Sequence, residues 1–238
     1  MRVFWRSLLF VLVGVSAMLL SAARFCRLDP LTIRMPHAIR SAVATLAVHE
    51  NSIGPNALNR AIAIDPDNAA AWGRRCTAYV GKDAAERLND CRRAVALRAT
   101  GANYRAEATA LEDTGDSCAS EAAYRTALSK RDIVHRGYVL RDQARAALAC
   151  GDINGSLAAL KSAEEFDQHN LLLSEAAAIS GRDGLAADRG YMSVVYEQMH
   201  QPQKAREMCS EANPGFGSCT CQLTGAGLSC SQNAPPSN

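Results

Sequence analysis

Nine cysteines are the residues of this 238-residue chain best suited to covalent chemistry. So many cysteines indicate a compartment outside the cytosol, because disulfides persist where conditions are oxidising. An odd number leaves one unpaired, and we expect this to be Cys26, which lies nearest the apolar start of the chain. The other eight are disulfide candidates, and small buried hydrophobic side chains are the alternative for the first four: Cys76, Cys91, Cys118, Cys150, Cys209, Cys219, Cys221 and Cys230.

A zinc site is the alternative for the last four cysteines. Cys219 and Cys221 have one residue between them, whereas zinc ligands usually have two to four. No histidine lies near this group in the sequence. We therefore expect no metal ion, and the four cysteines are expected to pair among themselves.

Catalytic signatures are missing from the sequence. The five histidines are scattered, without the His-x3-His or His-Glu-x2-His spacing of metal sites. There is no Gly-x-Ser-x-Gly elbow, no Gly-Lys-Ser/Thr phosphate loop and no Gly-x-Gly-x2-Gly motif opening a helix. We expect no enzymatic activity and no cofactor.

Composition favours helices over sheet. Alanine is abundant and aromatic residues make up 5% of the chain, while alternating Val/Thr-rich runs are missing. The formal net charge is only +2, so bulk charge does not indicate a nucleic-acid partner. These features predict an all-α protein.

The N-terminal segment, residues 1–23, has the pattern of an export signal. Arg2 and Arg6 precede an apolar run from Leu8 to Leu20, and the small residues 21–23 suit a cleavage site. An uncut membrane anchor over residues 3–23 fits equally well. Both interpretations place the rest of the chain in the periplasm or another extracytoplasmic space, because Arg2 and Arg6 would stay inside. Residues 24–36 then form a Pro-bounded connector.

The stretch Leu58–Trp72 predicts the end of one helix and the start of the next. Its apolar residues recur at helical spacing up to Ile64. Pro66 cannot continue that helix. Asn68 can cap the following helix through its side-chain oxygen.

This join resembles the one between tetratricopeptide repeats, which are helix–turn–helix units of 34 residues. Trp72 and Tyr79 match the aromatic positions of the repeat, although Arg75 and Cys76 replace its Leu-Gly pair. Later units place Gly-Asp pairs, at 115–116 and 151–152, at the turn between their two helices. Alanines of the second helices recur at separations of 33, 33, 36 and 49 residues: Ala61, Ala94, Ala127, Ala163 and Ala212.

The resemblance implies an α-α superhelix, a tetratricopeptide-like solenoid of four to five degenerate repeats over residues 37–212. A generic helical bundle is the alternative, since alanines at regular spacing suit both. The long last separation is attributed to an extra helical piece over 171–185 that ends at Gly181-Arg182-Asp183-Gly184. Residues 213–238 are rich in Gly, Pro and Ser, and we expect a mobile tail tethered by cysteines.

Repeat geometry also suggests cysteine pairs. Cys76 and Cys91 would face each other within one unit, and Cys118 and Cys150 would meet at the same end of adjacent units. Eight cysteines allow about 105 connectivities, so these pairs are a hypothesis.

Partner binding is expected in a groove, since first helices line the concave face in proteins of this type. Several arginines on this face can hold an acidic peptide or a terminal carboxylate. The alternative is a solvated face whose arginines pair with Asp142 and Glu112. The family's Lys/Asn carboxylate clamp is not reproduced. The residues expected to face inward are Arg74, Arg105, Thr109, Tyr138, Arg141 and Arg145.

Taken together, the sequence predicts a non-catalytic protein–protein interaction scaffold of the bacterial cell envelope, binding a peptide or a partner helix. The alternative is a membrane-anchored accessory subunit of an envelope assembly, secretion or polysaccharide complex.

Overall fold

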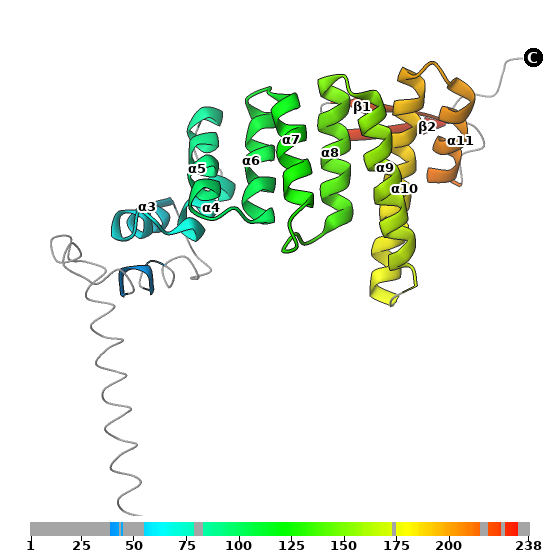
Figure 1. The fold of residues 1–238 in the computed structure, drawn as a ribbon. Helices are drawn as coiled ribbons and strands as arrows, with labels where there is room; N and C mark the ends of the chain where they lie inside the picture. The colour runs from blue at the N-terminus through cyan, green and yellow to red at the C-terminus, as the bar shows by residue number, and fades with distance from the viewer. Residues whose placement is uncertain are drawn as a thin grey trace, which may run out of the picture. The chain divides into compact units, whose positions relative to one another are not determined.

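The computed structural model describes residues 39–42, 44, 55–78, 83–172, 175–214, 219–224 and 227–232 (Figure 1). The chain divides into two compact units, Met1–Val80 and Gly81–Asn238. The expected export signal and the connector lie outside the described residues. Within the described part of the chain, no helix combines the length and apolar character needed to cross a membrane.

The first unit contains the join that the sequence predicted. Helices α3 (Pro55–Ile64) and α4 (Ala69–Ala78) flank it, and Leu58, Ala61 and Ala71 are buried together. The Asn68 side chain accepts a 3.0 Å hydrogen bond from the backbone N–H of Ala71, which confirms the predicted cap. The indole N–H of Trp72 donates to the carbonyl of Pro66 at 2.7 Å. This hydrogen bond links helix α4 to the turn that precedes it.

The second unit is a row of helices in which each packs against the next, as Figure 1 shows. Alanines lie at the contacts and allow the helices to approach closely. One buried cluster contains Ala108, Ala146 and Ala163 together with the larger side chain of Tyr124. In chain order the helices are α5 (Ala84–Leu97), α6 (Gly101–Asp113), α7 (Ser117–Leu128), α8 (Arg136–Cys150), α9 (Ile153–Asn170), α10 (Glu175–Gln198) and α11 (Pro202–Ala212).

Two Gly-Asp pairs form the turns between α6 and α7 and between α8 and α9. Gly115 and Gly151 have φ angles of 81° and 89°, in the left-handed region that glycine adopts without a steric penalty. Asp116 and Asp152 then accept hydrogen bonds from the backbone N–H groups of the next helices. Each glycine therefore ends one helix and each aspartate starts another. Between α10 and α11, His200 takes the left-handed position instead, with φ 56°.

Helix α10 differs from the sequence prediction. It is continuous over 24 residues, whereas Gly181-Arg182-Asp183-Gly184 was expected to end a shorter helical piece. Gly181 and Gly184 both lie inside this helix. Glycine is needed at these positions because a side chain at either one would collide with Asp167 on α9. These glycines serve helix packing rather than helix termination.

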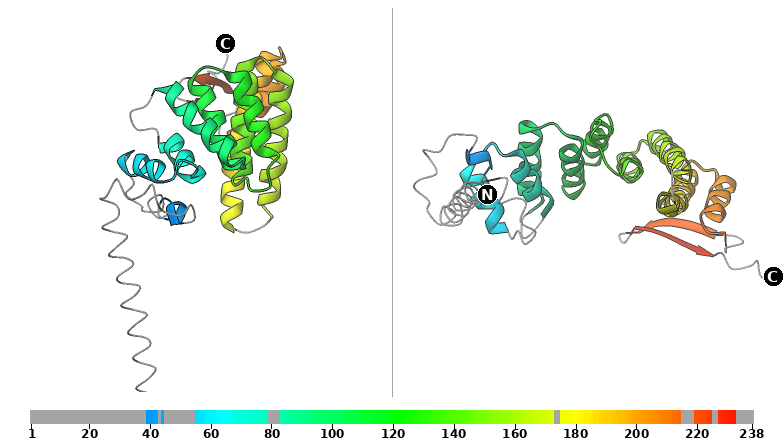
Figure 2. Two further views of the ribbon diagram at one scale, coloured as in Figure 1. Left: turned by 60° about the vertical axis from the view of Figure 1, so that its left-hand side comes forward. Right: turned by 90° about the horizontal axis from the view of Figure 1, so that it is seen from below.

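The C-terminal segment also differs from expectation. Strands β1 (Cys219–Thr224) and β2 (Gly227–Gln232) form an antiparallel hairpin in which Cys221 is opposite Cys230. The hairpin packs against α10 and α11, as Figure 2 shows. Cys219 and Cys221 are both buried because residues two apart in a strand share a face. The two strands thus pack on the helices through Cys219 and Cys221, where the sequence predicted a mobile tail over residues 213–238.

Candidate interaction face

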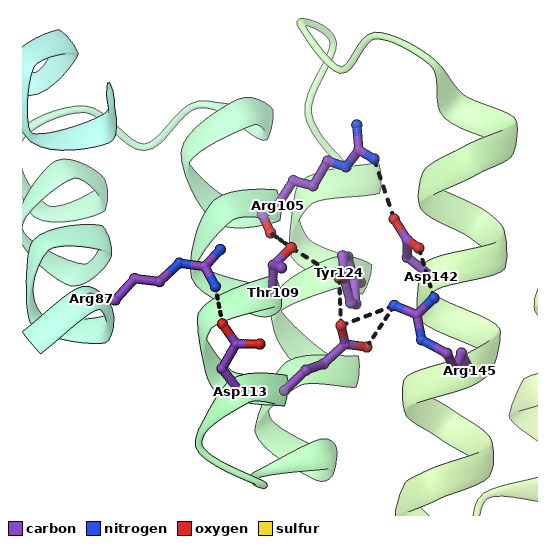
Figure 3. Close-up of polar contacts among 8 residues, drawn as sticks. Arg87, Arg105, Thr109, Asp113, Tyr124, Asp142 and Arg145 are labelled. Carbon is purple, nitrogen blue, oxygen red and sulfur yellow. Dashed lines mark hydrogen bonds and ion pairs between the residues drawn. The ribbon is translucent and has the colours of Figure 1, made fainter. Parts of the chain in front are cut away.

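Facing side chains of α6 and α8 build a polar network in the middle of the second unit (Figure 3). Arg105, Thr109 and Glu112 lie on α6 at the three- and four-residue spacing that shares one helix face. Asp142 and Arg145 lie three residues apart on α8. We call these five residues the α6–α8 face.

Ion pairs connect the two helices of this face. Arg145 donates from Nη2 to both carboxylate oxygens of Glu112, at 3.0 and 3.2 Å. Arg105 donates from Nη2 to Asp142 at 3.3 Å. Asp142 also pairs with Arg145 at 3.3 Å. Two positive and two negative groups therefore balance each other.

Tyr124 of α7 contacts two α6 residues of this network, Thr109 and Glu112. Its side chain is buried, and its hydroxyl donates to Glu112 at 3.3 Å and lies 3.2 Å from the Thr109 hydroxyl. Burial raises the pKa of Tyr124 well above its usual range, and burial also raises the pKa of Glu112 while Arg145 opposes that rise. The phenol is therefore a fixed donor at neutral pH that orients the carboxylate.

The two arginines of the face remain partly accessible. The side chain of Arg105 is 36% exposed and that of Arg145 is 42% exposed. Their carboxylate partners are less exposed, at 22% for Asp142 and 20% for Glu112. The two arginines are thus the more accessible members of these ion pairs, and each guanidinium is paired with an acid on the neighbouring helix.

A further ion pair joins α5 to α6. Arg87 donates to the carboxylate of Asp113, and the two side chains are drawn in Figure 3 beside the α6–α8 face. Arg87 is buried along most of its length, whereas Asp113 is partly exposed. This pair stabilises the contact between neighbouring repeats and does not present a free cation.

Arg141 is in the interior, where the sequence placed it on the groove. Its Nη1 donates to Asp167 of α9 at 2.7 Å and to Asp188 of α10 at 3.0 Å. Both carboxylates are almost fully buried. The guanidinium is therefore part of an internal triad of Arg141, Asp167 and Asp188.

Two further predicted residues, Tyr138 and Arg74, are not members of the α6–α8 face. Tyr138 is 53% exposed, and the guanidinium of Arg141 stacks 4.7 Å from the centre of its ring. Arg74 is exposed on α4 in the first unit. The structure therefore brings together Arg105, Thr109 and Arg145 from the predicted set.

Among the described residues of the second unit, three cysteine pairs lie at disulfide-bonding distance. Cys118 pairs with Cys150 across the ends of α7 and α8, the pairing suggested by the repeat geometry. The other pairs involve the hairpin: Cys209 with Cys219, and Cys221 with Cys230. Cys76 and Cys91, which were assigned to one predicted repeat, are both buried. The boundary between the two compact units of the chain falls between them, and their pairing remains a prediction.

Sequence reasoning did not find Asp167 and Asp188 as partners of Arg141. Asp167 of α9 pairs with Arg141 of α8 and lies beside Gly184 of α10. A local signal existed in the glycines of α10, since glycine inside a helix often marks a close approach.

Comparisons with known proteins bear on the fold. No protein-family model matches the sequence, and no curated protein matches it significantly. Two crystal structures of MamA are similar, with TM-scores of 0.53 and 0.56 at 14% and 12% sequence identity. These alignments cover 66% and 73% of this chain and 83% and 90% of the MamA chains.

A third similar structure is a kinesin light chain from Podosopora anserina with nearly identical TPR-like repeats. Its TM-score is 0.55 at 14% identity, and the alignment covers 76% of this chain and 96% of that one. At such identities the likeness concerns the fold alone. The chain has a tetratricopeptide-like all-α fold, as the sequence predicted.

Proposed function

We propose that this chain is a non-catalytic scaffold that binds an acidic protein segment on the α6–α8 face through Arg105 and Arg145. The observation that supports this proposal is that two partly exposed arginine side chains are each paired with a carboxylate of the facing helix. Each guanidinium has five N–H donors, and the contacts within the face use only those on the Nη atoms. The remaining donors are pre-oriented for a carboxylate, which lowers the entropic cost of binding.

The partner's chemistry follows from which groups are accessible. Asp142 and Glu112 neutralise the arginines but are themselves largely covered, so an incoming carboxylate meets the positive groups first. Part of the attraction is offset by the acids beneath, and binding should therefore be weak and sensitive to salt. Exposed Tyr138 on the same helix offers an aromatic contact for a neighbouring side chain.

Replacing both arginines tests this proposal. The double variant Arg105→Ala/Arg145→Ala should no longer retain a partner that is cross-linked to α6 or α8 of the unmodified protein and then identified by mass spectrometry. The matched control is Arg92→Ala/Arg125→Ala, which removes two charges from exposed side chains on α5 and α7. Equal retention by the double variant and the unmodified chain would contradict the proposal.

We further propose that the scaffold works in the bacterial cell envelope. Three cysteine pairs at bonding distance support an oxidising compartment, and the basic and apolar residues 1–23 support export. The alternative, an anchored accessory subunit, differs in whether residues 3–23 are retained. Mass spectrometry of the exported protein separates the two, because a mature chain beginning at Arg24 excludes the anchored form.

A further inference from the structure

The two disulfides of the hairpin are in direct contact. The Sγ atom of Cys221 lies 3.0 Å from the Sγ atom of Cys209, although each is bonded to a different cysteine. Cys219 and Cys221 lie on the same face of β1, two residues apart, and this face packs against α11 and α10. The fold therefore places a potential nucleophile against the neighbouring bond.

The four cysteine residues differ in their exposure to solvent. Cys209 and Cys219 are 0% exposed and Cys221 is 2% exposed. Cys230 alone among the four is only half-buried. In the outer disulfide, Cys221–Cys230, Cys230 is therefore the residue of the four that is most open to a thiol from outside, whereas both cysteines of the inner disulfide, Cys209–Cys219, are shielded.

We propose that these four cysteines form a disulfide relay, in which a small external thiol reduces the outer disulfide and the exchange then passes to the inner one. In the first step the thiolate attacks Sγ of Cys230 and forms a mixed disulfide there. The electron pair of the broken bond goes to Cys221, which leaves as a thiolate.

In the second step the Cys221 thiolate attacks Sγ of Cys209. A Cys209–Cys221 disulfide forms, the Cys209–Cys219 bond breaks, and Cys219 leaves as a thiolate that takes up a proton. A second external thiol then releases Cys230 by forming an external disulfide. Two external thiols are oxidised, one protein disulfide is reduced, and the products are Cys209–Cys221 with free thiols at Cys219 and Cys230.

The surroundings favour transfer over a resting Cys221 thiolate. Val194, Leu148 and Leu228 form the apolar cluster around these sulfurs, and a thiolate is poorly solvated there. Because Cys219 and Cys221 share one face of β1, the bond to α11 can move by two residues without reversing the strand. The hairpin stays attached to α11 throughout the exchange.

Partial reduction of the purified full-length chain with glutathione tests the relay. Free thiols are alkylated after an acid quench and located by mass spectrometry. No Lys or Arg follows Arg206, so all four cysteines lie in one tryptic peptide and must be resolved by fragmentation. The expected first product carries the Cys209–Cys221 bond with Cys219 modified. A first product that keeps Cys209–Cys219 while Cys221 is modified would overturn the proposal.

Two variants keep the test independent of folding. Cys230→Ser and Cys221→Ser/Cys230→Ser both remove the outer disulfide, so any loss of stability should affect them alike. In Cys230→Ser the free Cys221 should exchange with Cys209–Cys219 without added thiol. The second variant also replaces Cys221, so no free cysteine among the described residues remains within 4.8 Å of Cys209, and reduction of its inner disulfide by glutathione should be at least about tenfold slower than in the unmodified chain. Identical behaviour of the two variants would refute the relay.

Discussion

Arg141 and Arg145 lie one helical turn apart on α8 and occupy different electrostatic environments. Arg145 pairs with acids on a partly exposed face, where water screens the interaction. Arg141 lies between two buried carboxylates that share a single cation. The same residue type therefore contributes to a surface in one case and to the interior in the other.

Replacing these arginines should separate the two roles. We expect Arg141→Met to lower the free energy of unfolding by about 3–5 kcal/mol, because it leaves Asp167 and Asp188 buried without a counter-ion. The matched change Arg145→Met should cost about 0–1 kcal/mol. Urea unfolding at neutral pH measures both values, and equal losses would show that the triad is not a buried charge cluster.

Asp188 should make stability depend on pH. Burial, only partly offset by Arg141, raises the pKa of Asp188 from 3.8 to about 7, and Asp167 and Glu164 add to the rise. Its Oδ2 atom has no hydrogen-bond partner among the described residues, which agrees with a group that favours its neutral form. The folded state then holds this proton more tightly than the unfolded state does.

The contribution of Asp188 to stability is therefore largest below pH 4 and is lost as pH rises to about 7. We expect Asp188→Asn to gain stability relative to the unmodified chain over this range, by on the order of 4 kcal/mol at most. Unfolding measured at several pH values tests this, with Asp183→Asn, an exposed site on the same helix, as control. A stability difference that stays constant with pH would contradict the assignment.

At the scale of elements, glycine serves two purposes in this chain. Gly115 and Gly151 end helices because their φ angles are positive. Gly184 lies inside α10 and lets the Asp167 carboxylate approach the helix backbone. Sequence reasoning assigned the turns correctly but also treated Gly181-Arg182-Asp183-Gly184 as a helix end. The packing role depends on a residue of another helix, which periodicity does not reveal.

The sign of the stability change caused by Gly184→Ala tests this packing role. In an ordinary helix interior this change stabilises by roughly 0.5–1 kcal/mol. Here the added methyl group overlaps the Asp167 carboxylate, and we expect a loss of about 1–3 kcal/mol. Adding Asp167→Ala should remove the overlap and leave Arg141 paired with Asp188 alone. A double-mutant cycle measured by thermal unfolding should therefore show coupling, and additive effects would refute the contact.

At the scale of the whole molecule, contacts between neighbouring repeats hold the second unit together. Helices pack mainly on the next helix in the chain, as in other repeat proteins. Ion pairs and a disulfide add connections between repeats, including Arg87 with Asp113 and Cys118 with Cys150. Stability should therefore depend on these connections wherever small residues limit the buried area.

Removing the Cys118–Cys150 link tests that dependence. The double variant Cys118→Ser/Cys150→Ser releases a loop with a sequence separation of 32, and the chain-entropy estimate for such a loop is about 3–4 kcal/mol. We expect a loss of that order in urea unfolding without reductant. Once the disulfides are reduced, the variant and the unmodified chain should unfold at similar urea concentrations. An unchanged midpoint without reductant would show that the link is not formed.

The helical class, the join at Leu58–Trp72 and the two Gly-Asp turns were determined by the sequence alone, because they depend on neighbours a few residues apart, whereas the full length of α10 was not. The Asn68 cap, the Gly-Asp turns and the alanine spacing are all of this local kind. Tertiary structure decided which charges are buried and which are accessible. Arg141 and Asp188 are 47 residues apart, and Arg105 and Asp142 are 37 apart. Only the stacking of helices shows that one arginine is enclosed by carboxylates while another stays open to a partner.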